Sequence, residues 1–274
     1  MKRGDLRRLW LPLLGILAVL VPFLFWRGTW FGRPLNDAEI GRYLSDLSHP
    51  RHVQHALSQV ADRIIAGNRA GVERWYPQVR DLAHNETREV RMTAAWVLGQ
   101  DPQHSEAPAV LATLLADPEP LVRRNAALAL VRFGDDRGHD EITTMLRPYT
   151  VRSPATGRAR LRLEVGSTVN PGTLLARIEP EGGESIEVRS PVSGRVGELL
   201  LPNGSPSAEG DPLMKIEPSQ EEIWEGLRAL YLIGRPEDLE ALRFFARGGF
   251  GASDQVKRQA TLTAEAIERR QEGR

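Results

Sequence analysis

Three kinds of hydrophobic pattern follow one another along the chain. Residues 9–26 form an uncharged, strongly apolar run. Residues 35–147 and 219–274 place apolar positions at helical spacing, interrupted by turn residues. Between these helical stretches, residues 148–218 contain short extended runs punctuated by Gly, Pro, Asn and Ser, with strict alternation over residues 160–165. The pattern predicts a multidomain α + β protein: an N-terminal transmembrane helix, then an α-solenoid interrupted by a small all-β domain.

The apolar run predicts a membrane anchor within residues 1–34. As a helix, the run would be about 27 Å long, close to the thickness of the hydrocarbon layer. No small-residue cleavage pattern follows it, although a signal peptide and a buried helix remain the alternatives. The anchor residues that would contact lipid are Leu9, Trp10, Leu13, Leu14, Ile16, Leu17, Val19, Leu20, Val21, Phe23, Leu24, Phe25 and Trp26.

Charges beside the apolar run predict its orientation. Four basic residues precede the run and two follow within ten residues. Because basic residues favour the cytoplasmic side, the N-terminus is expected in the cytoplasm. This predicts a single-pass protein of the bacterial inner membrane with a periplasmic, extracytoplasmic remainder.

The helical stretches contain a repeat. Residues 82–98 align with residues 114–130 at an offset of 32, and residues 256–264 copy residues 122–130 almost class for class. A helical pair of this length cannot bury its apolar stripe alone and must stack on neighbouring pairs. The turn with Asp117-Pro118 and the following Val-Arg-x-x-Ala-Ala phrase resemble HEAT-like repeats.

That resemblance implies a solenoid with a protein-binding surface. It also suggests a role for Arg91 and Arg123, which recur at the same place in two repeats. In HEAT-like repeats this position usually binds acidic or carbonyl groups of the neighbouring repeat; binding of an acidic partner is the alternative.

The β stretch is duplicated. Residues 151–158 return as residues 188–195, and the Glu-Pro dipeptide at Glu179 returns at Glu217. Two equal β halves are expected to pack face to face, each covering the apolar side of the other. The motif order resembles the biotinyl/lipoyl carrier fold, also called the barrel-sandwich hybrid.

In carriers of that family the cofactor lysine sits at the hairpin between the two halves, here residues 181–185. This place falls at Gly183, and the single lysine of the stretch, Lys215, falls in the last predicted strand. The stretch therefore more closely resembles the cofactor-free module of periplasmic adaptor (membrane fusion) proteins, and no cofactor is expected. A partner could contact the hairpin tip, formed by Glu181, Gly182, Gly183 and Glu184.

Composition narrows the possible functions. The chain has 36 basic and 36 acidic residues and no Cys, which excludes disulfides, thiol catalysis and thiolate metal sites. The first 35 residues carry an excess of positive charge, so the remainder is mildly acidic, and a nucleic-acid surface is not expected.

Candidate polar sites are few. His49, His52 and His55 are three apart, but His49 precedes Pro50 and is expected in a turn, so no metal site is predicted. The acidic segment 135–141 is predicted to form the turn between two repeats, and no catalytic residues are predicted.

These features predict a non-enzymatic, membrane-anchored scaffold or adaptor, an accessory or assembly subunit of a transport, secretion or respiratory membrane complex. Its partners would be other membrane or periplasmic proteins, and the lipid bilayer through the N-terminal helix. No small-molecule substrate or nucleic acid is expected. The alternative is an enzymatic role, either as a lipoyl- or biotinyl-type carrier or as a lyase-like helical repeat enzyme.

Overall fold

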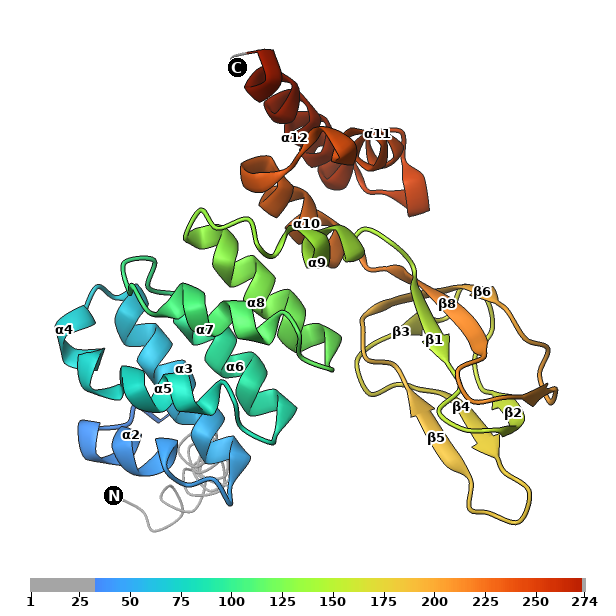
Figure 1. Cartoon of the computed structure of the whole chain (residues 1–274), viewed down its shortest axis with the longest axis horizontal. Helices are drawn as coiled ribbons and strands as arrows, with labels where there is room; N and C mark the ends of the chain where they lie inside the picture. Colours follow the sequence, from blue (N-terminus) through green and yellow to red (C-terminus); the bar gives the residue numbers. More distant parts are fainter. Residues whose placement is uncertain (1–32, 273–274) are drawn as a thin grey trace, which may run out of the picture. The chain divides into compact units, whose positions relative to one another are not determined.

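The computed structural model describes residues 33–272, which divide into two compact units at a sequence boundary between Gln78 and Val79 (Figure 1). The first unit is helical. The second combines helices with a β module. Each unit is considered by itself.

The first unit begins with a helix whose start is encoded locally. Asn36 caps α2 (Asp37–Leu44) by accepting a hydrogen bond from the backbone N–H of Glu39, whose side chain accepts one from the Asn36 backbone in return. Pro50 occupies the first turn of α3 (Pro50–Ile65). The unit continues with α4 (Arg69–Val72), η1 (Glu73–Trp75) and the first residues of α5 (Tyr76–Leu82).

The second unit contains two helical stretches. The first holds α6 (Arg88–Leu98), α7 (Ala107–Leu114), α8 (Pro120–Arg132) and α9 (His139–Thr144). The second holds α10 (Gln220–Ile233), η2 (Pro236–Asp238), α11 (Leu239–Ala246), η3 (Gly249–Gly251) and α12 (Asp254–Glu272). The Ala-rich face of α8 allows close packing, since a Cβ added at Gly99 would lie 2.6 Å from the Ala129 Cβ.

One hydrophobic core joins the two helical stretches across the β module. Ile142 and Met145 from α9 and its C-terminal end share a buried cluster with Ile223 and Leu227 from α10 and with Phe245 from α11. Figure 1 shows α8, α9 and α10 as neighbours. The helical packing therefore continues past the insertion, because residues on both sides of it bury apolar surface against each other.

The β module lies between α9 and α10 in the sequence and has its own core. Its strands are β1 (Tyr149–Arg152), β2 (Gly157–Leu161), β3 (Thr168–Val169), β4 (Leu174–Glu179), β5 (Ile186–Arg189), β6 (Gly194–Leu199), β7 (Pro206–Ser207) and β8 (Pro212–Pro218). They form two four-stranded antiparallel sheets, ordered β1-β8-β6-β3 and β5-β4-β2-β7.

The predicted face-to-face packing of the two duplicated halves is wrong in one respect, which the sheet order shows. The first half supplies β1 to β4 and the second supplies β5 to β8, yet each sheet contains two strands from each half. The halves therefore exchange strands, and one half does not simply cover the other. An approximate two-fold symmetry relates the two sheets: β1, β8, β6 and β3 of one sheet correspond, in this order, to β5, β4, β2 and β7 of the other.

The repeated motif has a physical explanation in this module. The buried Ser153 and Ser190 hydroxyls each donate a hydrogen bond to the backbone carbonyl of the residue two positions later in the chain. The oxygen–oxygen distance is 2.7 Å in both bonds. Gly157 and Gly194 lie against the backbone of Glu179 and Glu217, where an added Cβ would come within 2.6 and 2.0 Å of the carbonyl oxygens. The Ser-Pro-x-x-Gly and Glu-Pro elements therefore recur because each half needs the same close contacts.

The predicted transmembrane helix and membrane location require correction. Residues 9–26 lie outside the described residues, and within residues 33–272 no helix is both long enough and apolar enough to cross a bilayer. The longest described helix, α12, carries four acidic and four basic side chains, which would be costly in hydrocarbon. The fold class is therefore a helical array with an inserted β module and no supported membrane-spanning helix, and the predicted inner-membrane location is likewise not supported.

Candidate functional site

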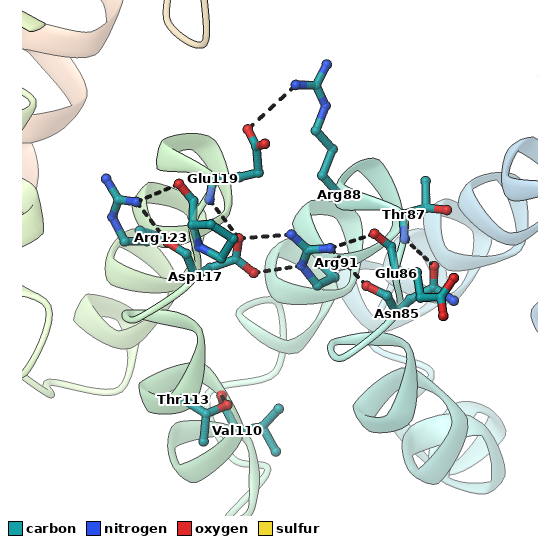
Figure 2. A network of polar contacts seen from close by, with 11 residues as sticks. Asn85, Glu86, Thr87, Arg88, Arg91, Val110, Thr113, Asp117, Glu119 and Arg123 are labelled. Carbon is teal, nitrogen blue, oxygen red and sulfur yellow. Dashed lines mark hydrogen bonds and ion pairs between the residues drawn. The ribbon is translucent and has the colours of Figure 1, made fainter. Parts of the chain in front are cut away.

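The recurring arginines form a ladder between successive helical repeats (Figure 2). The guanidinium of Arg91 binds both carboxylate oxygens of Asp117, at 2.6 and 2.9 Å, and donates to the backbone carbonyls of Asn85 and Glu86. Arg123 repeats the pattern one unit later: it donates to the backbone carbonyl of Asp117 at 2.8 Å and binds a carboxylate on α9. The expected role of these arginines in binding the neighbouring repeat is confirmed.

The ladder is a structural element because its charges are satisfied internally. Arg91 and Asp117 are both largely buried, with side chains 13% and 6% exposed. Burial alone would raise the pKa of Asp117, but hydrogen bonds from the Arg91 guanidinium and the Glu119 backbone outweigh burial and hold this pKa below its usual range. The bidentate pair therefore fixes the inter-repeat turn and does not point at an acidic partner.

A second buried ion pair connects the helices on either side of the β module. Nη1 of Arg124 in α8 lies 2.6 Å from Oε1 of Glu222 in α10, and the two side chains are 7% and 12% exposed. Burial raises the pKa of Glu222, although the positive charge of Arg124 opposes this shift. The pair holds α10 to the preceding repeat.

The acidic segment 135–141 belongs to the same structural network. His139 is buried, and its Nε2 lies 2.8 Å from an oxygen of Asp238, which also accepts from the Arg235 backbone. Asp135 is bound by the side chain and backbone of Arg137, whose guanidinium keeps the pKa of Asp135 low. The segment thus caps and joins helices, as predicted for a turn between two repeats.

An open groove lies on the faces of α6, α8 and α10, and the sequence analysis did not identify it. Its cavity is about 420 Å³, and its wall includes Trp96, Leu128, Arg132, Arg228 and Leu232. The exposed fractions of Trp96 and Leu232 are 37% and 58%, so both large apolar side chains present surface to solvent in the groove. The available sequence signal was a Trp directly after the buried Ala94-Ala95 pair, on the side of the helix turned away from the core.

The predicted hairpin connects β4 to β5, and its four tip residues are exposed. Gly182 has a positive φ of 75°, which explains its residue type. Lys215 lies within β8, which pairs with both β1 and β6, and its Nζ binds Glu198 at 2.8 Å. The expected place of Lys215 inside the last strand is confirmed, and the hairpin has no lysine.

The three histidines considered as ligands separate into two sets in the first unit. His49 and His52 lie beside Asp46, with their Nδ1 atoms 2.9 and 2.7 Å from its two carboxylate oxygens. His55 lies outside this group and is partly buried, which lowers its pKa. Asp46, the third residue of this group, was not identified from the sequence because it precedes α3 and shares no helical face with the histidines.

Comparisons with known proteins match two parts of this description. Residues 42–131 and 76–156 match the family described as HEAT repeats. The biotin carboxyl carrier protein of acetyl-CoA carboxylase from Nostoc sp. (strain PCC 7120) is 32% identical over 108 residues, which cover 37% of this chain and 58% of that protein. The chain thus spans less than two thirds of this curated relative. HEAT repeats lie within residues 42–156, and the chain is in part similar to a biotin carboxyl carrier protein, whereas the likeness to periplasmic adaptors stays a prediction.

Proposed function

We propose that this chain is a non-enzymatic scaffold, an accessory or assembly subunit that binds a partner protein in the groove of its helical array. HEAT repeats are helical protein-interaction scaffolds, so protein binding in general follows from residues 42–156. The groove narrows the proposal to one face of α6, α8 and α10.

The exposed apolar pair in the groove is the observation that carries the proposal. Trp96 lies on α6, before the β module in the sequence, and Leu232 lies on α10, after it. Both side chains line the same cavity. Buried Trp side chains dominate the binding free energy of many protein interfaces, because they remove a large apolar area from water. A partner side chain that fills the cavity would cover both residues at once.

Charges around the pair favour a partner segment with both apolar and polar groups. Arg132 and Arg228 supply positive charge, while Glu221 and Glu225 supply negative charge. Partial burial and the neighbouring Glu221 raise the pKa of Glu225. A mixed rim of this kind selects the register of a partner more than it adds affinity.

A carrier function is the second candidate, because of the partial similarity to a biotin carboxyl carrier protein. The hairpin argues against it, since Gly183 stands at the place expected for the cofactor lysine and Lys215 is held within a central strand. We therefore propose that the β module carries no covalent cofactor and contributes a docking surface through its tip.

The groove is tested by comparing the double variant W96D/L232D with the control L262D in quantitative pull-downs from native extracts. Leu262 is 51% exposed on α12 and does not line the groove, so L262D measures the effect of placing one carboxylate at an exposed leucine elsewhere. We expect the groove variant to lose proteins that the wild type and L262D retain, with unchanged circular dichroism. Equal retention by all three proteins would reject the groove as the binding surface.

A further inference from the structure

A compact group of metal-capable side chains lies in the turn that joins α2 to α3. Asp46, His49 and His52 each offer one ligand atom, and these atoms all lie within 4.8 Å of one another. Two imidazole nitrogens and one carboxylate oxygen are ligands that zinc commonly takes in proteins. Because the three residues are spaced by three, two successive turns bring them together: the connection before α3 and the first turn of α3.

The backbone and the rings hold this group in place. The backbone N–H of His49 donates to the Asp46 carbonyl at 3.0 Å, and that of His52 donates to the His49 carbonyl at 2.8 Å. The imidazole of His52 stacks with the ring of Tyr43, at a centroid distance of 4.5 Å, and with that of His49, at 5.0 Å. These contacts bring the three side chains close together before an ion binds, which lowers the entropy cost of binding.

The carboxylate supplies the charge of the group. Asp46 accepts hydrogen bonds from the side chains of His49, His52 and Ser48, so its oxygens face the two imidazole rings. One carboxylate beside two imidazole nitrogens is a ligand set that favours a divalent cation over an anion.

We propose that Asp46, His49 and His52 bind one Zn²⁺ ion through Nδ1 of each histidine and a carboxylate oxygen, with a fourth position open to water. Ligands of a tetrahedral zinc ion lie about 3.3 Å apart. The Nδ1 atoms of His49 and His52 lie 2.9 Å from Oδ1 and 2.7 Å from Oδ2 of Asp46. Binding through one carboxylate oxygen therefore requires small rotations of these partly exposed side chains until the three ligand atoms have this spacing.

Binding requires a change of tautomer in both rings. Without the ion, the Nδ1 atoms are placed to donate their protons to the Asp46 carboxylate. A zinc ion takes the Nδ1 lone pairs, and each ring then carries its proton on Nε2. The side chains of His49 and His52 are 64% and 45% exposed, so water can exchange this proton.

The test is equilibrium dialysis of the full chain, purified without a histidine tag, against Zn²⁺, with the bound metal measured by atomic absorption. We expect about one zinc ion per chain. D46N should weaken binding about tenfold or more because the charged ligand is lost, and H49A/H52A should abolish it. The matched control H84A, which removes an exposed histidine outside the group, should bind as the wild type does.

Three further measurements complete the test, and the last of them detects misfolding. Substitution with Co²⁺ should give the intense visible absorption of a four-coordinate ion, and nitrogen NMR should show the proton of both rings moving from Nδ1 to Nε2. Circular dichroism establishes whether each variant retains its helices. Zinc binding that survives in H49A/H52A, or no saturable binding by the folded wild type, would overturn the proposal and leave a hydrogen-bonded turn alone.

Discussion

Arg124 and Glu222 are 98 positions apart in the sequence, yet their side chains form a buried ion pair 2.6 Å long that joins α8 to α10. The intervening residues include the whole β module. This pair and the shared core beneath it make the helices after the insertion a continuation of the repeats before it.

Removing one member of this pair is expected to destabilise the protein strongly. R124A leaves the Glu222 carboxylate buried without its cation, which typically costs about 3–5 kcal/mol. The free energy of unfolding, measured in urea by circular dichroism, should fall by that amount. R243A is the matched control, since Arg243 pairs with Glu268 between α11 and α12 but both are exposed, and it should cost about 1 kcal/mol or less. Equal losses in the two variants would contradict the role of the buried pair.

The Arg91–Asp117 pair predicts a pH dependence of stability. The pKa of Asp117 is lowered in the folded protein, so the pair stabilises the fold above the unfolded-state pKa of about 3.9 and loses this contribution as the pH falls through the folded-state value. At pH 7, D117N should lower the free energy of unfolding by roughly 1–3 kcal/mol. The difference from wild type should shrink below about pH 4.

The control for this experiment is D254N, because Asp254 is 82% exposed and pairs with Lys257 at the surface. Its unfolding free energy should follow that of the wild type at every pH. A difference between D117N and wild type that stays constant from neutral to acid pH would show that the charge of Asp117 does not stabilise the ladder.

The β module is expected to be dispensable for folding of the helices. Tyr149 pairs with Ile216 in adjacent strands, so the two ends of the module lie about 5 Å apart and a short Gly/Ser linker can replace residues 151–218. The shortened chain should keep cooperative thermal unfolding by circular dichroism, since the core between α9 and α10 is made by the helices themselves. Non-cooperative melting would place the module within the structural core.

The native β module is expected to carry no covalent cofactor. Intact-mass spectrometry of protein from its own cells should show no biotinyl or lipoyl addition, because the hairpin lacks a lysine and Lys215 is bound to Glu198 within β8. A useful comparison is G183K, which is sterically permitted, since a Cβ at Gly183 would lie 3.4 Å from the nearest atom, in Pro180. A mass addition mapped to Lys215 in the wild type would refute the proposed absence of a cofactor.

Much of this fold was predictable because its signals are local. The cap at Asn36, the helix starts at Pro50 and Pro120, and the Arg91 and Arg123 repeat each depend on contacts within about one turn or one repeat. The duplicated β motif identified the module and its two halves. These features are encoded by neighbouring residues, so residue type and spacing suffice to predict them.

Other features were decided by tertiary structure. Apolarity and length at residues 9–26 predicted a membrane-spanning helix; those residues lie outside the described part of the chain, and no helix within residues 33–272 has both properties. The position of Asp46 beside His49 and His52 follows from the conformation of one turn, which the helical periodicity of α3 does not report.

The sequence alone determined that helical repeats surround a duplicated β module without a hairpin lysine. Only the tertiary structure decided that the two halves exchange strands, that Arg124 meets Glu222, and that Trp96 and Leu232 line one groove. The physical reason is that these contacts join residues far apart in the chain. Such contacts depend on the packing of whole elements, and local residue preferences do not specify which distant elements will pack together.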